Sequence, residues 1–169
     1  WIPTIPASTT SCACAWMIGD RLYTATVGDS RVYLLRGGGI TRLSKDHTWV
    51  QEAIDNGLLL PEEVSGHPNA HIIRRYLGSP VAPDVDLRMR VSGEETDEQA
   101  ELNQGLRLEP YDRVLLTSDG LTDLVDVVLE PYWVTLRIPP KYQTDKIRLI
   151  KLVRSLSGSQ LLHAKYLVE

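Results

Sequence analysis

Two aspartates lie just beyond strand-like segments, and a third follows one of them closely, so carboxylate chemistry could be built there. Asp29 follows the alternating run 22–27, and Asp119 follows the apolar run 114–116. A carboxylate at a strand end is held by rigid backbone and can bind a hard divalent cation without deep burial. Asp123 lies four residues after Asp119, so a helical turn there would bring both acids to one side. The pattern is compatible with a metal site, but taken alone it favours ordinary turns and helix caps, which Asp-Gly often forms.

Other candidate chemistries have weaker support. The triple glycine at 37–39 lacks the Lys-Ser/Thr of a phosphate loop and joins two strand-like runs, which favours a hairpin turn. Ser30 has no G-x-S-x-G elbow around it, and the acidic run 94–101 lacks the alternating oxygens of a calcium loop. The histidines show no zinc-type spacing and are expected to be surface or supporting groups; they are His47, His67, His71 and His163.

Short strands joined by tight turns must position these acids. Alternation and Gly-Asp or glycine-rich breaks predict strands over residues 11–17, 22–27, 31–36 and 40–43. Four such strands in succession predict an antiparallel sheet rather than parallel strands with helical crossovers.

Helical spacing enters after residue 46. Val50, Ala53 and Ile54 fall on one face before Gly57, and Pro61 opens a short second helix. Alternation predicts a strand over 84–91, and the acidic segment 92–104 reads as an exposed loop. Residues 105–118 predict a strand pair across a proline turn. An amphipathic helix over 144–156 and a terminal strand complete an α+β domain dominated by antiparallel strands.

Composition limits the class of protein. The 169 residues carry a net charge of −4, with 43% hydrophobic and 24% charged residues, so one globular domain over 1–169 is expected and a general nucleic-acid-binding surface is not. The apolar runs are too short to cross a membrane. Cys12 and Cys14 are two apart, which is poor geometry for a mutual disulfide and suits a reducing compartment. A cytoplasmic location is the expectation.

Several motifs together resemble a known family. "VGDSRVYLLR", "LSKDHT" and "LLTSDGLTD" occur in order between about Thr9 and Val125, and with the residues between them they resemble the bacterial branch of the metal-dependent protein phosphatases, type 2C. The resemblance implies a β-sandwich of two antiparallel sheets flanked by helices. It also implies bacterial signalling by hydrolysis of phosphoserine and phosphothreonine in proteins, with a cognate kinase as a partner.

The resemblance assigns roles to the three aspartates. Asp119 corresponds to a ligand of a catalytic pair of Mn²⁺ or Mg²⁺ ions, and Asp29 and Asp123 to acids around a third, weaker metal. A bridging water activated by the metals would attack phosphorus, so no protein nucleophile is implied. Residues from about 47 to 73 correspond to a flap beside the site.

The chain also departs from that family. No segment matches the family's first portion, which carries a phosphate-binding Arg and a metal-bridging Asp-Gly. After about Asp126 the likeness fades, and residues 126–169 form a divergent part in which Leu161 and Leu162 stand where the family has Asp-Asn. We therefore expect weakened or absent metal binding and slow hydrolysis from these 169 residues alone. The alternatives are a fragment of a phosphatase, an inactive phosphatase-like domain that serves as a regulatory or binding module, and a plain sandwich with acidic turns.

Overall fold

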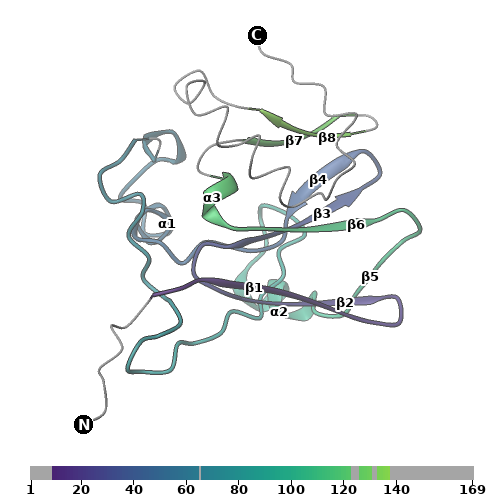
Figure 1. The fold of residues 1–169 in the computed structure, drawn as a ribbon, viewed down its shortest axis with the longest axis horizontal. Helices are drawn as coiled ribbons and strands as arrows, with labels where there is room; N and C mark the ends of the chain where they lie inside the picture. The colour runs from purple at the N-terminus through teal and green to yellow at the C-terminus, as the bar shows by residue number, and fades with distance from the viewer. Residues whose placement is uncertain (1–8, 65, 123–125, 131–132, 138–169) are drawn as a thin grey trace, which may run out of the picture. The chain divides into compact units, whose positions relative to one another are not determined.

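The structure is a computed structural model that describes residues 9–64, 66–122, 126–130 and 133–137 (Figure 1). The chain divides into two compact units, Trp1–Ser118 and Asp119–Glu169, and each is described by itself. The prediction of a single domain over 1–169 stays a prediction. The predicted helix over 144–156 and the terminal strand lie outside the described residues.

The first unit contains two antiparallel sheets of three strands, in the orders β1-β2-β5 and β4-β3-β6. In Figure 1, β1 and β2 lie below β3 and β6. The strands of the first sheet are β1 (Cys12–Ile18), β2 (Arg21–Val27) and β5 (Leu106–Arg107). Those of the second are β3 (Arg31–Arg36), β4 (Gly39–Arg42) and β6 (Arg113–Thr117). The predicted strands over 11–43 are thus confirmed, and so is the hairpin turn at the triple glycine.

Apolar side chains from both sheets meet in one core. Leu22 of β2 packs with Val32 and Leu34 of β3, and Leu43 and Met89 complete this buried cluster. Alternation explains the arrangement, because Leu22, Thr24 and Thr26 all lie on the buried face of β2. The α+β fold with an antiparallel β-sandwich is confirmed.

Three helical segments accompany the sheets of this unit. They are α1 (Trp49–Asp55), the 3-10 turn η1 (Pro61–Glu63) and α2 (Asp97–Leu102). In α1, Thr48 caps the first turn, accepting a hydrogen bond from the Gln51 N–H, and Val50 and Ala53 are buried. The second unit contains α3 (Asp119–Thr122), β7 (Asp126–Glu130) and β8 (Trp133–Arg137), with β7 and β8 paired antiparallel.

The predicted strand over 84–91 is wrong. The segment is extended, but its backbone bonds go to three different places: Asp86 pairs with Thr26, Met89 N–H donates to Ala100 O, and Arg90 N–H donates to Leu43 O. A strand needs a continuous ladder to one neighbour, and this segment has none among the described residues.

The predicted exposed loop over 92–104 is also wrong in part, because it contains α2. Thr96 and Gln99 form a reciprocal capping box, and Ala100 is fully buried, whereas Leu102 at the end of the helix is exposed. The strand pair predicted over 105–118 exists as two strands that do not pair with each other. β5 joins β2, whereas β6 joins β3 in the other sheet.

Candidate functional site

Asp29 occupies the turn between β2 and β3, where the sequence predicted a metal-binding carboxylate. Its side chain is half-buried. The preceding Gly28 has φ +98°, and a Cβ added there would lie 2.4 Å from Ser11 Cβ. Glycine is therefore required at 28 by both backbone conformation and space.

The segment 43–47 runs beside this turn and holds it in place by hydrogen bonds. Leu43 N–H donates to Val32 O (2.8 Å), and His47 N–H donates to Gly28 O (2.9 Å). The Ser44 hydroxyl accepts from Val32 N–H at 3.0 Å. Two motifs that are adjacent only in the fold, "GDSR" and "SKDH", thus form one interlocked unit.

Charge pairing strengthens the same contact. Arg31 Nε lies 3.1 Å from each carboxylate oxygen of Asp46, and its Nη2 lies 2.7 Å from Oδ2. Arg42 also pairs with Asp46, which is largely buried between the two guanidinium groups. Burial alone would lower the pKa of Arg31, but the hydrogen bonds and charge of Asp46 outweigh it and raise that pKa above its usual range. Arg31 is therefore charged at neutral pH, and its ion pair with Asp46 is a fixed support behind the Asp29 turn.

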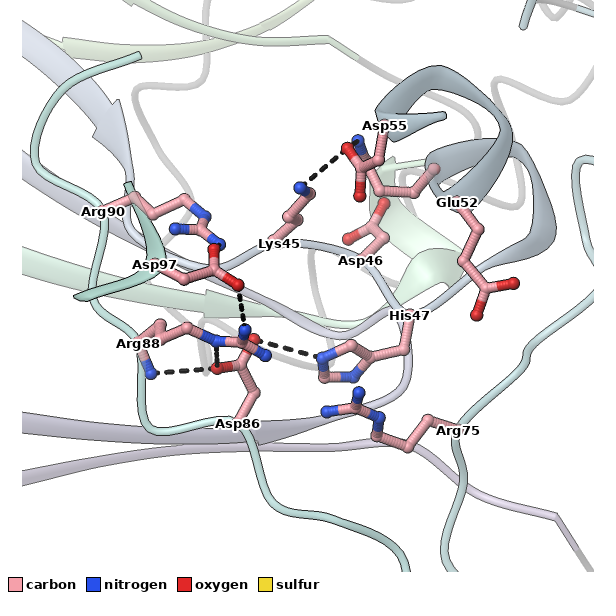
Figure 2. Close-up of a pocket in the computed structure, with 11 residues that line it drawn as sticks. Lys45, Asp46, His47, Glu52, Asp55, Arg75, Asp86, Arg88, Arg90 and Asp97 are labelled. Atoms are coloured by element: carbon pink, nitrogen blue, oxygen red, sulfur yellow. Dashed lines mark hydrogen bonds and ion pairs between the residues drawn. The ribbon is translucent and has the colours of Figure 1, made fainter. Parts of the chain in front are cut away.

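A cavity of about 180 Å³ opens beside His47 (Figure 2). Its lining is strongly charged, with acids and bases paired across it. Lys45 Nζ lies 2.7 Å from Asp55 Oδ1, and Arg90 Nη2 lies 2.7 Å from Asp97 Oδ1. The lining residues are Lys45, Asp46, His47, Gln51, Glu52, Asp55, Arg75, Asp86, Arg88, Arg90 and Asp97.

Asp119, the other main candidate ligand, begins α3 in the second unit and is exposed. Its Oδ1 accepts a hydrogen bond of 2.7 Å from the Gly120 N–H. The short helix after the β6 strand confirms the helical turn expected there. Asp123 lies outside the described residues.

The candidate metal ligands Asp29 and Asp119 are considered separately, because they belong to different units. Carboxylate oxygens are the donors that Mn²⁺ and Mg²⁺ prefer, so the chemistry of Asp29 and Asp119 fits such ions. The two residues belong to different units, and within the described ranges no three His, Cys, Asp or Glu side chains gather into a metal-binding group. The ligand set Asp29, Asp119 and Asp123 therefore stays a prediction.

Two residues that support the site were not singled out from the sequence. His47 was expected to be a surface or supporting group and is buried, with 9% of its surface exposed. Asp86 was read only as part of a strand, yet it is buried and contacts His47 across 39 positions of sequence. The "SKDH" motif was a signal for His47, but no local pattern indicates Asp86.

The family model for Protein phosphatase 2C matches residues 5–53. The serine/threonine protein phosphatase PstP of Mycobacterium tuberculosis is 35% identical over 153 residues, covering 89% of this chain and 25% of that protein. A putative protein phosphatase 2C-type from Streptococcus pyogenes is 35% identical over 103 residues, covering 60% of this chain and 35% of that protein.

Solved structures agree with these matches. The crystal structure of the Mycobacterium tuberculosis phosphatase PstP/Ppp superposes with a TM-score of 0.54 at 37% identity, covering 70% of this chain and 43% of that one. Stp1 from Staphylococcus aureus gives a TM-score of 0.57 at 27% identity, covering 87% and 52%.

The chain spans between a quarter and about two fifths of the length of the curated relatives it matches. Among the described residues, no helix is long and apolar enough to span a bilayer. The match to the family model, the 35% identity with PstP over most of this chain and the shared fold show that the chain belongs to the bacterial branch of the type 2C protein phosphatase family.

Proposed function

We propose that this chain is part of a metal-dependent protein serine/threonine phosphatase that hydrolyses phosphate monoesters on phosphoserine and phosphothreonine. The observation that carries the proposal is the interlock of residues 28–32 with 43–47, which lies within the segment matched by the family model. The names of the matched relatives, serine/threonine protein phosphatases, support the same reaction class.

Asp29, Asp119 and Asp123 are the proposed ligands of Mn²⁺ or Mg²⁺. When bound, such ions lower the pKa of a coordinated water and stabilise negative charge on the phosphoryl group. The contribution of this chain is to hold the carboxylates in place. Gly28 and His47 fix the backbone that leads into Asp29, and the Gly120 N–H orients Oδ1 of Asp119.

Phosphoserine and phosphothreonine proteins are the proposed substrates, a kinase that phosphorylates them is the proposed partner, and the cytoplasm is the proposed location. The alternative is an inactive phosphatase-like module. The two differ in whether Asp29 and Asp119 bind metal ions, so metal binding is the property to measure.

The experiment is calorimetric titration of the 169-residue chain with Mn²⁺, paired with turnover of p-nitrophenyl phosphate at millimolar Mn²⁺. A small number of carboxylate ligands binds two hard cations only weakly. We therefore expect weak Mn²⁺ binding and slow turnover, both reduced further by Asp119→Asn. Glu101→Gln removes another exposed acid, from α2, and serves as the matched control.

Two outcomes would contradict these expectations. A fast rate that Asp119→Asn abolishes would show that these residues alone form a complete site. Mn²⁺ binding that is unchanged in Asp29→Asn and Asp119→Asn would remove both residues from the ligand set and favour the binding module.

A further inference from the structure

His47 lies where three segments of the first unit meet, and it bonds to all of them. Its backbone N–H donates to Gly28 O (2.9 Å), and its ring Nδ1 accepts from the Gly28 N–H (3.0 Å). Its Nε2 lies 3.2 Å from Asp86 Oδ2 (Figure 2). The ring bond to the Gly28 N–H fixes the peptide plane that precedes Gly28, and the backbone bond to Gly28 O fixes the plane that leads directly into Asp29.

The pairing defines which ring nitrogen carries the proton. The Gly28 N–H is a donor, so Nδ1 must be an acceptor, and a neutral imidazole then carries its proton on Nε2, which faces Asp86. An acceptor at the Asp86 position is therefore what selects the tautomer that can hold Gly28.

Asp86 is itself held rigidly. Its Oδ1 accepts from the Arg88 N–H (2.9 Å) and from Arg88 Nε (2.6 Å), and Arg88 pairs in turn with Asp97 of α2. Burial would raise the pKa of Asp86, but the hydrogen bonds from His47 and Arg88 outweigh it and hold that pKa well below its usual range. The acceptor that faces His47 is thus a charged carboxylate at neutral pH.

The backbone of His47 is fixed as well, because it lies at the base of the segment that resembles the family's flap. Arg74 N–H donates to His47 O (2.7 Å), and Trp49 N–H donates to Ile72 O (2.8 Å). These bonds close residues 47–74 into a loop whose two ends are joined at His47. Movement of this residue would therefore require breaking bonds in three segments.

We propose that His47, with its tautomer set by Asp86, is a positioning residue that fixes the direction of the Asp29 carboxylate. In this role it acts through the Gly28 backbone. Its consequence for metal binding rests on the proposed function, whereas its effect on the Gly28–Asp29 turn does not.

Two substitutions separate the bonds that His47 makes. In His47→Asn, the side-chain oxygen takes the place of Nδ1 and can still accept from the Gly28 N–H, while the bond to Asp86 is lost. In His47→Gln, the terminal amide nitrogen takes the place of Nε2 and can still donate to Asp86, while the acceptor for Gly28 is lost. Both variants remove a buried ring, so they are matched controls for each other.

Amide hydrogen exchange followed by NMR on the 169-residue chain measures the effect. We expect the Gly28 amide to exchange about tenfold faster in His47→Gln than in the wild type, because a buried donor loses its partner. In His47→Asn the rate should stay within about threefold of the wild type. The Val32 amide, which donates to Ser44 Oγ, reports general loosening and should be equally protected in both variants. A long-range nitrogen–proton spectrum of His47 should show the proton on Nε2.

Equal Gly28 exchange in the two variants, or a proton on Nδ1, would overturn the proposal. If His47→Gln fails to fold, loss of Gly28 protection in folded His47→Asn would also overturn it. Paramagnetic broadening of the Asp29 amide by Mn²⁺ supplies the second arm, with stronger broadening expected in His47→Asn than in His47→Gln. No broadening in the wild type, alongside the expected Gly28 rates, would refute Asp29 as a ligand and leave the positioning role standing.

Discussion

Among the glycines whose surroundings the structure describes, Gly28 is the one where an added methyl group should cost the most stability. Its φ of +98° is unfavourable for any side chain, and the new Cβ would lie 2.4 Å from Ser11 Cβ and 2.9 Å from Ser11 Cα. Backbone strain contributes about 1–2 kcal/mol and overpacking about 1–3 kcal/mol. We therefore expect Gly28→Ala to lower the free energy of unfolding by about 2–5 kcal/mol.

Gly19 provides the matched control. It also has a positive φ, +64°, in the turn between β1 and β2, but a Cβ there would meet no atom within 4 Å. Gly19→Ala should therefore cost only the strain, about 1 kcal/mol. The loss of unfolded-state entropy caused by alanine is the same in both variants and cancels in the comparison.

Urea denaturation followed by circular dichroism measures the difference. With a slope of about 2 kcal/mol per molar urea, the midpoint should fall by about 1–2.5 M in Gly28→Ala and by about 0.5 M in Gly19→Ala. The reasoning is refuted if the two variants unfold at the same urea concentration. That result would mean that Ser11 and its strand move away from the turn at little cost.

Further measurements test other parts of the first unit. Because the pKa of Asp86 in the folded protein lies below its ordinary value of 3.8, its contribution to stability is present above about pH 4 and is lost as the pH falls further. The difference in unfolding free energy between the wild type and Asp86→Asn should therefore shrink on acidification below pH 4, and a constant difference from pH 7 to pH 2.5 would contradict this. β1 pairs with β2 along one edge, no described strand pairs with its other edge, and Trp16 on it is 67% exposed. An exposed apolar edge strand promotes association, so light scattering should show self-association of the 169-residue chain that Trp16→Lys reduces. A monomer at all concentrations, or a variant that associates equally, would show that β1 is not the contact.

Much of the local structure follows from the sequence. The alternation over residues 11–43 predicted β1 to β4, because the side chains of a strand point alternately to opposite faces. The spacing of Val50, Ala53 and Ile54 predicted α1, because residues three and four positions apart lie on the same face of a helix. The helical turn after Asp119 was also predicted from the sequence.

The elements that were wrongly predicted are those whose partners are distant. Residues 84–91 alternate like a strand, but Asp86, Met89 and Arg90 bond to three separate segments. Alternation shows only that a chain is extended and does not specify a continuous neighbour. Within 92–104, the signal for α2 was present in Thr96 and Gln99, and the burial of Ala100 was decided by tertiary packing.

The candidate site likewise has features that depend on sequence neighbours and features that depend on distant residues. The sequence alone determined that Asp29 follows a strand and that Asp119 begins a helical turn, because both facts depend on neighbouring residues. Only the tertiary structure decided that His47 holds Gly28 and that Asp86 holds His47, because these bonds join positions 19 and 39 residues apart. A residue type shows what a side chain can donate or accept, whereas the fold determines which partner lies within hydrogen-bonding distance.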